Sequence, residues 1–195
     1  MSGKINKLEK SLHDSIKAKV SIIQIHDEVK KAIQQIYNRI KKGGKVILCG
    51  NGGSAADAQH LAAEFLVRLR PKVNRQSIPA ITLATDTSTI TACGNDYSFE
   101  DIFSRNLSSL GNNKDVLIVI STSGNSKNII QALKVARKKK ILSIGFLGCN
   151  GGKMKNLCDI PLLIDHQVTA RIQEAHIFLG HHIFESVEDQ LIRKL

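Results

Sequence analysis

Apolar residues along the chain alternate between short continuous runs and helically spaced stripes. The runs predict buried strands at Lys45–Cys49, Ala80–Ala84, Val116–Ser121, Ile141–Leu147 and Ile160–Ile164. Helical spacing is typical of the intervening segments, at about residues 54–70, 87–93, 99–110 and 126–139. Strands that alternate with helices predict an α/β fold, with a five-stranded parallel sheet flanked by helices in the flavodoxin-like manner.

Helical patterns also flank this core. Residues about 4–42 predict one or two helices that stop at Gly43-Gly44, and residues about 168–194 predict a long amphipathic helix. The sequence contains no linker or repeat. We therefore expect one domain over residues 1–195, with an N-terminal helical segment at 1–42 and an α/β core with its C-terminal helix at 43–195.

Composition narrows the class of protein. The chain has 195 residues and is 42% hydrophobic, which argues against disorder. No apolar run reaches the length of a membrane span, and no apolar signal core follows the lysine-rich N-terminus, so we expect no membrane association and no secretion. The four cysteines lack CxxC spacing, which favours reduced, mostly buried thiols in a cytoplasmic protein.

The formal net charge is +11. Such a charge permits contact with nucleic acid and equally suits anionic metabolites. The densest basic run, Arg137-Lys138-Lys139-Lys140, closes a predicted helix, where cations meet the negative end of the helix dipole. Aromatic residues are only 4% and are not interleaved with the basic runs, so we expect no nucleic-acid partner.

The first candidate site follows the first predicted strand. Cys49-Gly50-Asn51-Gly52-Gly53-Ser54 joins that strand to an alanine-rich helix. A glycine turn at a helix N-terminus presents backbone N–H groups and a partial positive charge, which together favour an anion such as phosphate.

The second candidate site follows the strand predicted at Val116–Ser121. There Ser121-Thr122-Ser123-Gly124-Asn125-Ser126 leads into another helix. Hydroxyls and turn amides at the end of a strand can surround phosphate oxygens. An ordinary serine N-cap is the alternative. Three serines and a threonine within six residues favour the phosphate interpretation.

Neither loop is a nucleotide-binding motif of the usual kind. No Gly-Lys-Ser/Thr completes a Walker sequence, and Gly50, Gly52 and Ala55 give only a weak dinucleotide fingerprint. No acidic residue ends the next strand, although Asp86 lies near it. We expect no nucleotide cofactor.

His60 and Glu64 form an i,i+4 pair on the first core helix, with Asp57 three residues before the histidine. Such a pair can bind zinc or share a proton, and a plain surface hydrogen bond is the alternative. The last helix carries Gln173, Glu174, His176, His181 and His182. Spacing alone does not choose among these histidines, although His176, three residues from Gln173, is the one we would select for a shared face.

Taken together, these motifs resemble the SIS (sugar isomerase) domain, and within it the phosphoheptose isomerases. Further matches are Gly43-Gly44-Lys45-Val46, Gly94-Asn95-Asp96, Asp101-Ile102-Phe103-Ser104-Arg105, Gly151-Gly152-Lys153-Met154, and Arg171-Ile172-Gln173-Glu174-Ala175-His176 followed by His181. The likeness spans about residues 43–182.

The resemblance implies isomerisation of sedoheptulose 7-phosphate to D-glycero-D-manno-heptose 7-phosphate, the first step of bacterial heptose synthesis for surface glycans. It implies a homotetramer with active sites between subunits. It selects His181, not His176, as the catalytic partner of Glu64. It assigns substrate binding to Asn51, Gly52, Gly53, Ser54, Glu64, Asn95, Asp96, Ser121, Thr122, Ser123, Ser126 and Gln173.

Some members of this family hold zinc through residues that match His60, Glu64, Gln173 and His181. In a metal-free site Glu64 would instead take the proton and His181 would supply one to oxygen. Gln173 and His181 are about 12 Å apart along an uninterrupted helix. We therefore expect that Gln173 lies at an irregular helix start, or that the pair is divided between subunits.

Three rival functions remain. A non-catalytic SIS scaffold that binds a replication initiator protein has no chemical reason to keep Glu64 and His181. A sugar-phosphate-sensing regulator would carry a DNA-binding module, and a glutamine-dependent amino-sugar isomerase would carry an amidotransferase domain. The sequence favours the heptose phosphate isomerase.

Overall fold

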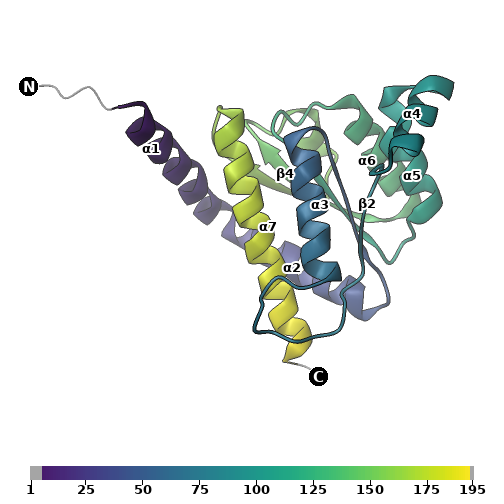
Figure 1. Cartoon of the computed structure of the whole chain (residues 1–195), viewed down its shortest axis with the longest axis horizontal. Coiled ribbons are helices and arrows are strands. Elements are labelled where there is room, and N and C mark those ends of the chain that lie inside the picture. Colours follow the sequence, from purple (N-terminus) through teal and green to yellow (C-terminus); the bar gives the residue numbers. More distant parts are fainter. Residues whose placement is uncertain (1–5, 194–195) are drawn as a thin grey trace, which may run out of the picture.

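The computed structural model describes residues 6–193 and contains a five-stranded parallel sheet with helices on both faces (Figure 1). The strands are β1 (Val46–Gly50), β2 (Ala80–Thr82), β3 (Val116–Ser121), β4 (Leu142–Gly148) and β5 (Ile160–Ile164). The α-helices are α1 (Lys7–Val20), α2 (His26–Lys41), α3 (Gly53–Leu66), α4 (Thr87–Asp96), α5 (Ile102–Leu110), α6 (Lys127–Lys139) and α7 (Thr169–Ile192). Short 3-10 turns are η1 (Ser21–Ile25), η2 (Phe99–Asp101) and η3 (Gly152–Asn156).

The strand order is β2-β1-β3-β4-β5, and every pairing is parallel. This is the flavodoxin-like order, and the predicted fold class is therefore confirmed. The order reverses between β1 and β3, so the loops after these two strands leave a common edge in opposite directions. Ligands of such folds bind in the crevice at that point. Both glycine- and serine-rich motifs lie there.

The two faces of the sheet have separate apolar cores. One core packs α2, α3 and α7 against residues such as Leu48, Ile118 and Phe146. The other packs α4, α5 and α6 against Ile47, Leu117 and Val119. Because neighbouring residues of a strand point to opposite faces, strands covered on both sides must be apolar throughout, as the continuous runs of the sequence predicted.

Several element boundaries differ from the predicted ones. The strand expected at Ala80–Ala84 ends at Thr82, because Ala84 has a φ of +52°, which strand geometry does not allow. The helix expected at 54–70 ends at Leu66. The helix expected at 87–93 continues through Gly94 to Asp96. The expected helical segments at both ends of the chain extend in part beyond the described residues.

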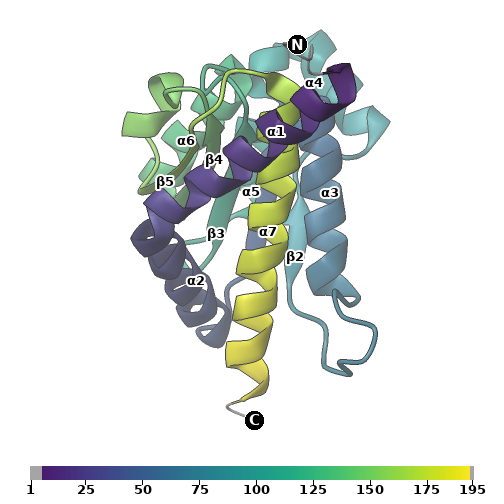
Figure 2. The same cartoon turned by 90° about the vertical axis from the view of Figure 1, so that its left-hand side faces the viewer.

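The predicted N-terminal helical segment is two helices joined by η1 (Figure 2). Helix α1 crosses α7 and buries only Ser15 and Ala18 along its length. Helix α2 is packed more deeply and belongs to the core on the α7 side. The N-terminal segment is thus anchored by α2 and presents most of α1 to its surroundings.

An ion cluster fastens the extended segment after α3 to the far end of α7. Glu188 is 1% exposed and accepts hydrogen bonds from the Arg70 Nε at 2.7 Å and the Arg75 Nε at 2.5 Å. Arg75 also donates to the carbonyls of Glu64 and Phe65, at the end of α3. These contacts fix the C-terminal ends of α3 and α7 relative to each other.

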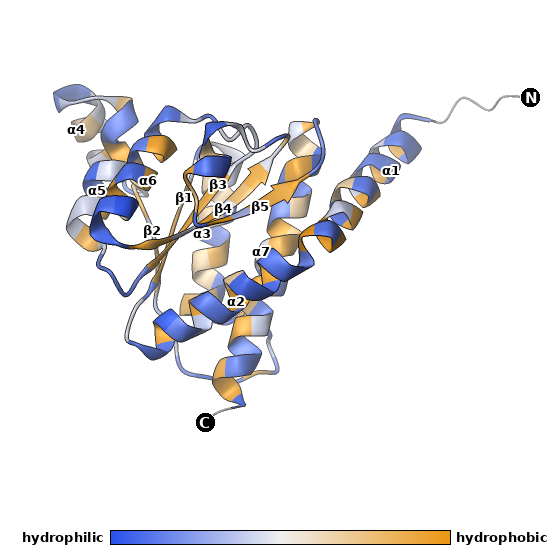
Figure 3. Cartoon of the chain, turned by 180° about the vertical axis from the view of Figure 1, so that it is seen from behind, coloured by the Kyte–Doolittle hydropathy of each residue, from blue (hydrophilic) through white to orange (hydrophobic). Residues whose placement is uncertain are grey.

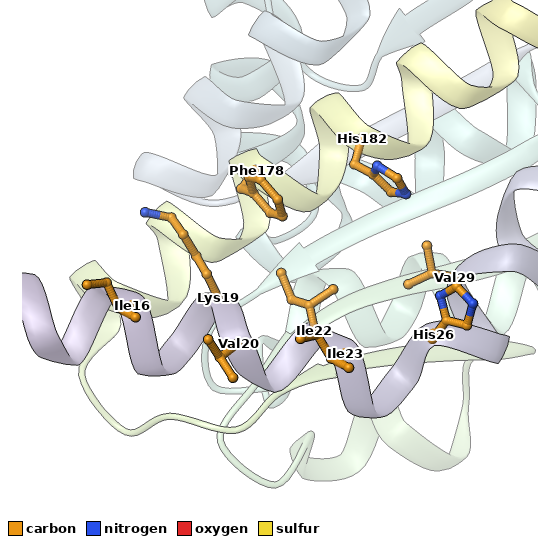
Figure 4. Close-up of a pocket in the computed structure, with 9 residues that line it drawn as sticks. All are labelled: Ile16, Lys19, Val20, Ile22, Ile23, His26, Val29, Phe178 and His182. Atoms are coloured by element: carbon orange, nitrogen blue, oxygen red, sulfur yellow. The ribbon is translucent and has the colours of Figure 1, made fainter.

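An apolar groove with a volume of about 420 Å³ runs between the N-terminal segment and α7 (Figure 4). It is lined by Ile16, Lys19, Val20, Ile22, Ile23, His26, Val29, Phe178 and His182. Val20 is 55% exposed, Ile23 73% and Phe178 48%. Apolar and polar residues are mixed along α1 and α2, whereas the strands are apolar (Figure 3). Single exposed apolar residues are ordinary, but a continuous groove of them marks a contact surface.

His176 occupies the core on the α7 side and has no solvent exposure. Its ring lies 6.2 Å from that of Phe146, and neither ring nitrogen has a well-formed hydrogen bond. Burial lowers the pKa of His176 to about 4, against a smaller opposing effect of the Leu147 backbone. The imidazole is therefore neutral near pH 7.

This buried imidazole predicts a loss of stability in acid. The unfolded chain binds the proton below about pH 6.5, whereas the folded chain resists it until about pH 4. The contribution of neutral His176 to the free energy of unfolding is therefore fully present above pH 6.5. It falls by about 1.4 kcal/mol per pH unit as the pH drops toward 4. We expect His176→Phe to flatten this slope in urea unfolding measured across that range.

The exposed His13 provides the control, since His13→Phe should leave the slope unchanged. An unaltered slope in His176→Phe would show that another group causes the acid loss.

Candidate active site at the carboxyl edge of the sheet

The glycine turn after β1 leads directly into α3. Gly52 precedes the helix with a φ of +56° and provides no side-chain cap. Gly50 lies so close to the next turn that a Cβ there would be 2.5 Å from the Ser54 carbonyl oxygen. The N–H groups of Ser54 and Ala55 are bonded within the turn, to the carbonyls of Asn51 and Gly52, so this corner offers a ligand mainly the positive end of the helix dipole.

The serine loop after β3 forms the second corner. The Ser121 Oγ accepts from the Gly124 N–H at 3.1 Å, and the Ser123 Oγ accepts from the Asn125 N–H at 3.2 Å. Ser126 occupies the N-cap position of α6 but makes no side-chain capping bond. The ordinary N-cap alternative is therefore wrong for Ser126, and the start of α6 is open toward the loop.

A third loop, after β4, supports the serine loop from behind. Gly124 has a φ of +64°, and a Cβ at this position would collide with the Gly151 carbonyl. The Met154 N–H donates to the Gly124 carbonyl at 3.0 Å, and the Lys153 N–H donates to the Asn125 Oδ1 at 3.1 Å. The backbone of the exposed Lys153 is thus held next to the serine loop.

Asn51 and Asn128 join the two corners. Each side-chain amide donates to the oxygen of the other at 2.9 Å. Asn128 is 2% exposed and also accepts from the Ile129 N–H. Sequence reasoning selected Asn51 and missed Asn128, although its place in the first turn of the helix after the serine loop was the available signal.

Helices α3 and α7 lie side by side and bring three chemically active side chains together (Figures 1 and 2). The Nε2 atoms of His60 and His181 are 2.8 Å apart, and the His60 Nε2 is 3.4 Å from the Glu64 Oε1. One ligand atom from each of the three residues lies within 4.8 Å of the others. The predicted pairing of His60, Glu64 and His181 is therefore present within one chain.

Burial acts on the charge of one of these three residues. The pKa of His181 is lowered by burial first and by the neighbouring His60 second. The Glu64 side chain is 16% exposed, and its buried Oε2 has no hydrogen-bond partner. At most one of the two facing Nε2 atoms carries a proton, and a metal ion that replaced this proton would meet a lone pair from each ring. Two imidazoles and a carboxylate with a free oxygen are a suitable donor set for zinc.

Gln173 lies elsewhere. A Cβ on Gly53 would be 2.5 Å from the Gln173 Nε2, so this side chain lies across the glycine turn. Helix α7 is a continuous α-helix over Thr169–Ile192. The expectation that Gln173 sits at an irregular helix start is therefore wrong. Within one chain Gln173 is about two turns from His181, at the glycine turn rather than among the three residues.

His176 is not a site residue. It faces the sheet and is completely buried, whereas His181 faces α3. The nearness of His176 to Gln173 in sequence suggested the wrong histidine. At about 100° per residue, the five positions from His176 to His181 place the two side chains about 140° apart around α7, on different faces.

Asn95 and Asp96 are the last two residues of α4, which extends past the helix end expected at about residue 93. Both are exposed, and the Asn95 Nδ2 donates to the Asp96 Oδ1 at 2.8 Å. Asp96 lines a crevice with Tyr97 and Arg105, whose guanidinium lies 3.6 Å from the Tyr97 ring centroid. Asp86 caps α4 through the Thr89 N–H and has no ligand role here.

The chain is similar to known proteins over nearly its full length. A family model described as the SIS domain matches residues 9–148. A phosphoheptose isomerase from Clostridium acetobutylicum is 47% identical over 95% of both chains, and phosphoheptose isomerase 2 from Campylobacter jejuni is 47% identical over 93% of this chain and 90% of its own.

Two solved structures are similar to this chain in fold and in sequence. A phosphoheptose isomerase from Neisseria gonorrhoeae superposes with a TM-score of 0.87 at 38% identity, covering 94% of this chain and 97% of that one. One from Francisella tularensis gives a TM-score of 0.88 at 34% identity, with the same coverage.

Proposed function

The chain belongs to the SIS domain family and, within it, to the phosphoheptose isomerases, and we propose that it converts sedoheptulose 7-phosphate to D-glycero-D-manno-heptose 7-phosphate. This aldose–ketose isomerisation is the first step of bacterial heptose synthesis for surface glycans. The observation that carries it is the joint presence of an open anion corner and of Glu64 with His181 at one edge of the sheet.

The alternative, a scaffold that binds a replication initiator protein, is not favoured. The relatives that match at high coverage are named isomerases, and this chain places the two catalytic candidates beside each other.

The reaction moves a proton between C1 and C2 through an enediol. It needs a base, an acid and stabilisation of the charge that develops on oxygen. Glu64 is the candidate base, because its Oε2 is buried and unpaired. His181 is the candidate acid that supplies a proton to the substrate oxygen, which an imidazole can do from a ring N–H group.

We assign the phosphate to the serine loop. Ser121, Thr122, Ser123 and Ser126 supply hydroxyls there, and the start of α6 supplies backbone donors. Asn51, Gly52, Gly53 and Ser54 would line the sugar between the two ends, with Gln173 above the glycine turn. Asn95 and Asp96 would contact the sugar that is bound at the site of a neighbouring subunit.

We propose one zinc ion per subunit, held by His60, Glu64 and His181. When bound, zinc would polarise the substrate carbonyl as a Lewis acid. Gln173, the fourth candidate ligand, lies too far along α7 to join these residues within its own chain, so we assign that position to the Gln173 of another subunit. A carboxylate that ligates a metal is a weaker base, so Glu64 would serve as ligand or base at different steps.

We propose a homotetramer that closes over the apolar groove. The groove carries exposed Val20, Ile23 and Phe178, which another copy of the same groove-lining helices would bury. The N-terminal segment 1–42 would then be the oligomerisation segment. We also expect a cytoplasmic location, which the four free thiols suit. Among residues 6–193 no helix has the length and apolarity of a membrane span.

The catalytic assignment predicts that Glu64→Gln and His181→Ala each lower kcat for sedoheptulose 7-phosphate by about 10²- to 10⁴-fold, the range for loss of a general acid or base. Purified protein should be assayed for the aldose product, with circular dichroism to confirm folding. Glu28→Gln, at an exposed glutamate on α2 away from the three side chains, is the control and should retain full activity. Near-normal turnover in either variant would overturn the roles.

The metal assignment predicts that chelation removes about one zinc per chain and most of the activity. Added zinc should restore both in the wild-type protein but not in His60→Ala, because that variant lacks one imidazole ligand. Metal content should be measured by elemental analysis beside the rate. Full activity in protein without zinc would leave only the metal-free mechanism.

The groove assignment predicts that Val20→Glu with Ile23→Glu breaks the tetramer, because two buried charges without partners are costly. Light scattering should report fewer than four chains per particle, and activity should fall with the shared sites. Leu110→Glu, a 43% exposed apolar residue on α5, is the matched control. A double variant that stays tetrameric would place the interface elsewhere.

A further inference from the structure

Asp57 is a carboxylate for which the proposed mechanism has no use. It lies on α3 and is half-buried, and its Oδ2 is buried without a hydrogen-bond partner in the described part of the chain. Desolvation raises the pKa of Asp57, and His60 partly opposes this effect. A buried acceptor without a donor is costly, so its presence calls for a physical reason.

The position of Asp57 relative to the active site suggests that reason. It precedes His60 by three residues, and His60 precedes Glu64 by four, so the three side chains lie in a column on one face of α3. Helical side chains lean toward the N-terminus of their helix. Glu64 therefore leans toward His60, as its 3.4 Å contact shows, and Asp57 lies one turn before His60 on the same face.

The two nitrogens of His60 are used differently. Its Nε2 faces the His181 Nε2 at 2.8 Å and the Glu64 Oε1 at 3.4 Å. Its Nδ1 makes no hydrogen bond to residues 6–193. A neutral imidazole that offers a lone pair at Nε2 must carry its proton on Nδ1. The column thus contains one nitrogen that needs an acceptor and one buried oxygen that needs a donor.

We propose that Asp57 is the positioning residue for His60: its carboxylate holds the proton on Nδ1, fixes the ring, and keeps the Nε2 lone pair directed into the active site. Asp57 acts through His60 and does not touch the substrate. Carboxylates play this part beside many metal-binding histidines. The inference rests on the metal site proposed above and adds a residue to it.

If Asp57 instead served the packing of α3, replacing it would lower the stability of the metal-free protein. Its neighbours Ala58 and Leu61 are apolar and fully buried, so the packing of α3 does not need a charge at this position. The uncharged Asp57→Asn has the same shape and a smaller desolvation cost. If Asp57 serves the site, Asp57→Asn should weaken metal binding without lowering the stability of the metal-free protein.

The test uses Co²⁺ as the probe, bound to chelator-treated protein and followed by its visible absorption in competition with a chelator. We expect Asp57→Asn to bind Co²⁺ about 10- to 100-fold more weakly than the wild-type protein. The unfolding temperature of the metal-free variant should be unchanged or higher. Asp27→Asn, at an exposed aspartate on α2, is the control and should match the wild-type affinity.

A second measurement needs no metal. In protein with ¹⁵N-labelled histidine, the His60 ring should show the Nδ1-protonated tautomer in the wild type and a mixture in Asp57→Asn. Equal Co²⁺ affinity together with an unchanged tautomer would overturn the role of Asp57, and so would a lowered unfolding temperature that accounts for the loss of affinity. A wild-type protein that binds no Co²⁺ would instead overturn the metal site itself.

Discussion

The close approach of α3 and α7 is the contact on which the active site depends. Gly180 allows it, because a Cβ there would lie 2.6 Å from Leu61 Cδ1. Nearer the C-terminal ends of the two helices, the rings of Phe65 and Phe184 stack with centroids 3.8 Å apart. Glu188 holds the helix ends together through Arg70 and Arg75. Two rigid helices held at this distance place His181 against His60 and Glu64 with little freedom.

The anion corner depends on a different constraint, the reversal of strand order between β1 and β3. It brings the glycine turn and the serine loop to one crevice, where the Asn51–Asn128 amide pair joins them. The substrate of a phosphoheptose isomerase has a charged tail and a reactive carbonyl at opposite ends of a seven-carbon chain. One end of the site is built by the sheet and the other by the helix pair, which suits a ligand of that kind.

Part of this was evident from residue patterns. The continuous apolar runs predicted five strands covered on both faces, since each strand residue meets one core or the other. The motif after β3 predicted a phosphate corner, and the His60 and Glu64 spacing placed both on one helical face. Where local geometry interfered, as at Ala84 with its positive φ or at Gly94 inside α4, the predicted boundaries failed.

The sequence by itself determined the fold class, the two loops and the pair on α3, because these follow from short-range periodicity and turn chemistry. Local spacing favoured His176 and the family resemblance favoured His181, and the tertiary structure decided between them. His176 is buried in the core, whereas His181 contacts His60. The tertiary structure also revealed Asn128 and placed Gln173 over Gly53. Contacts between helices far apart in the chain depend on packing across the sheet, which no local pattern encodes.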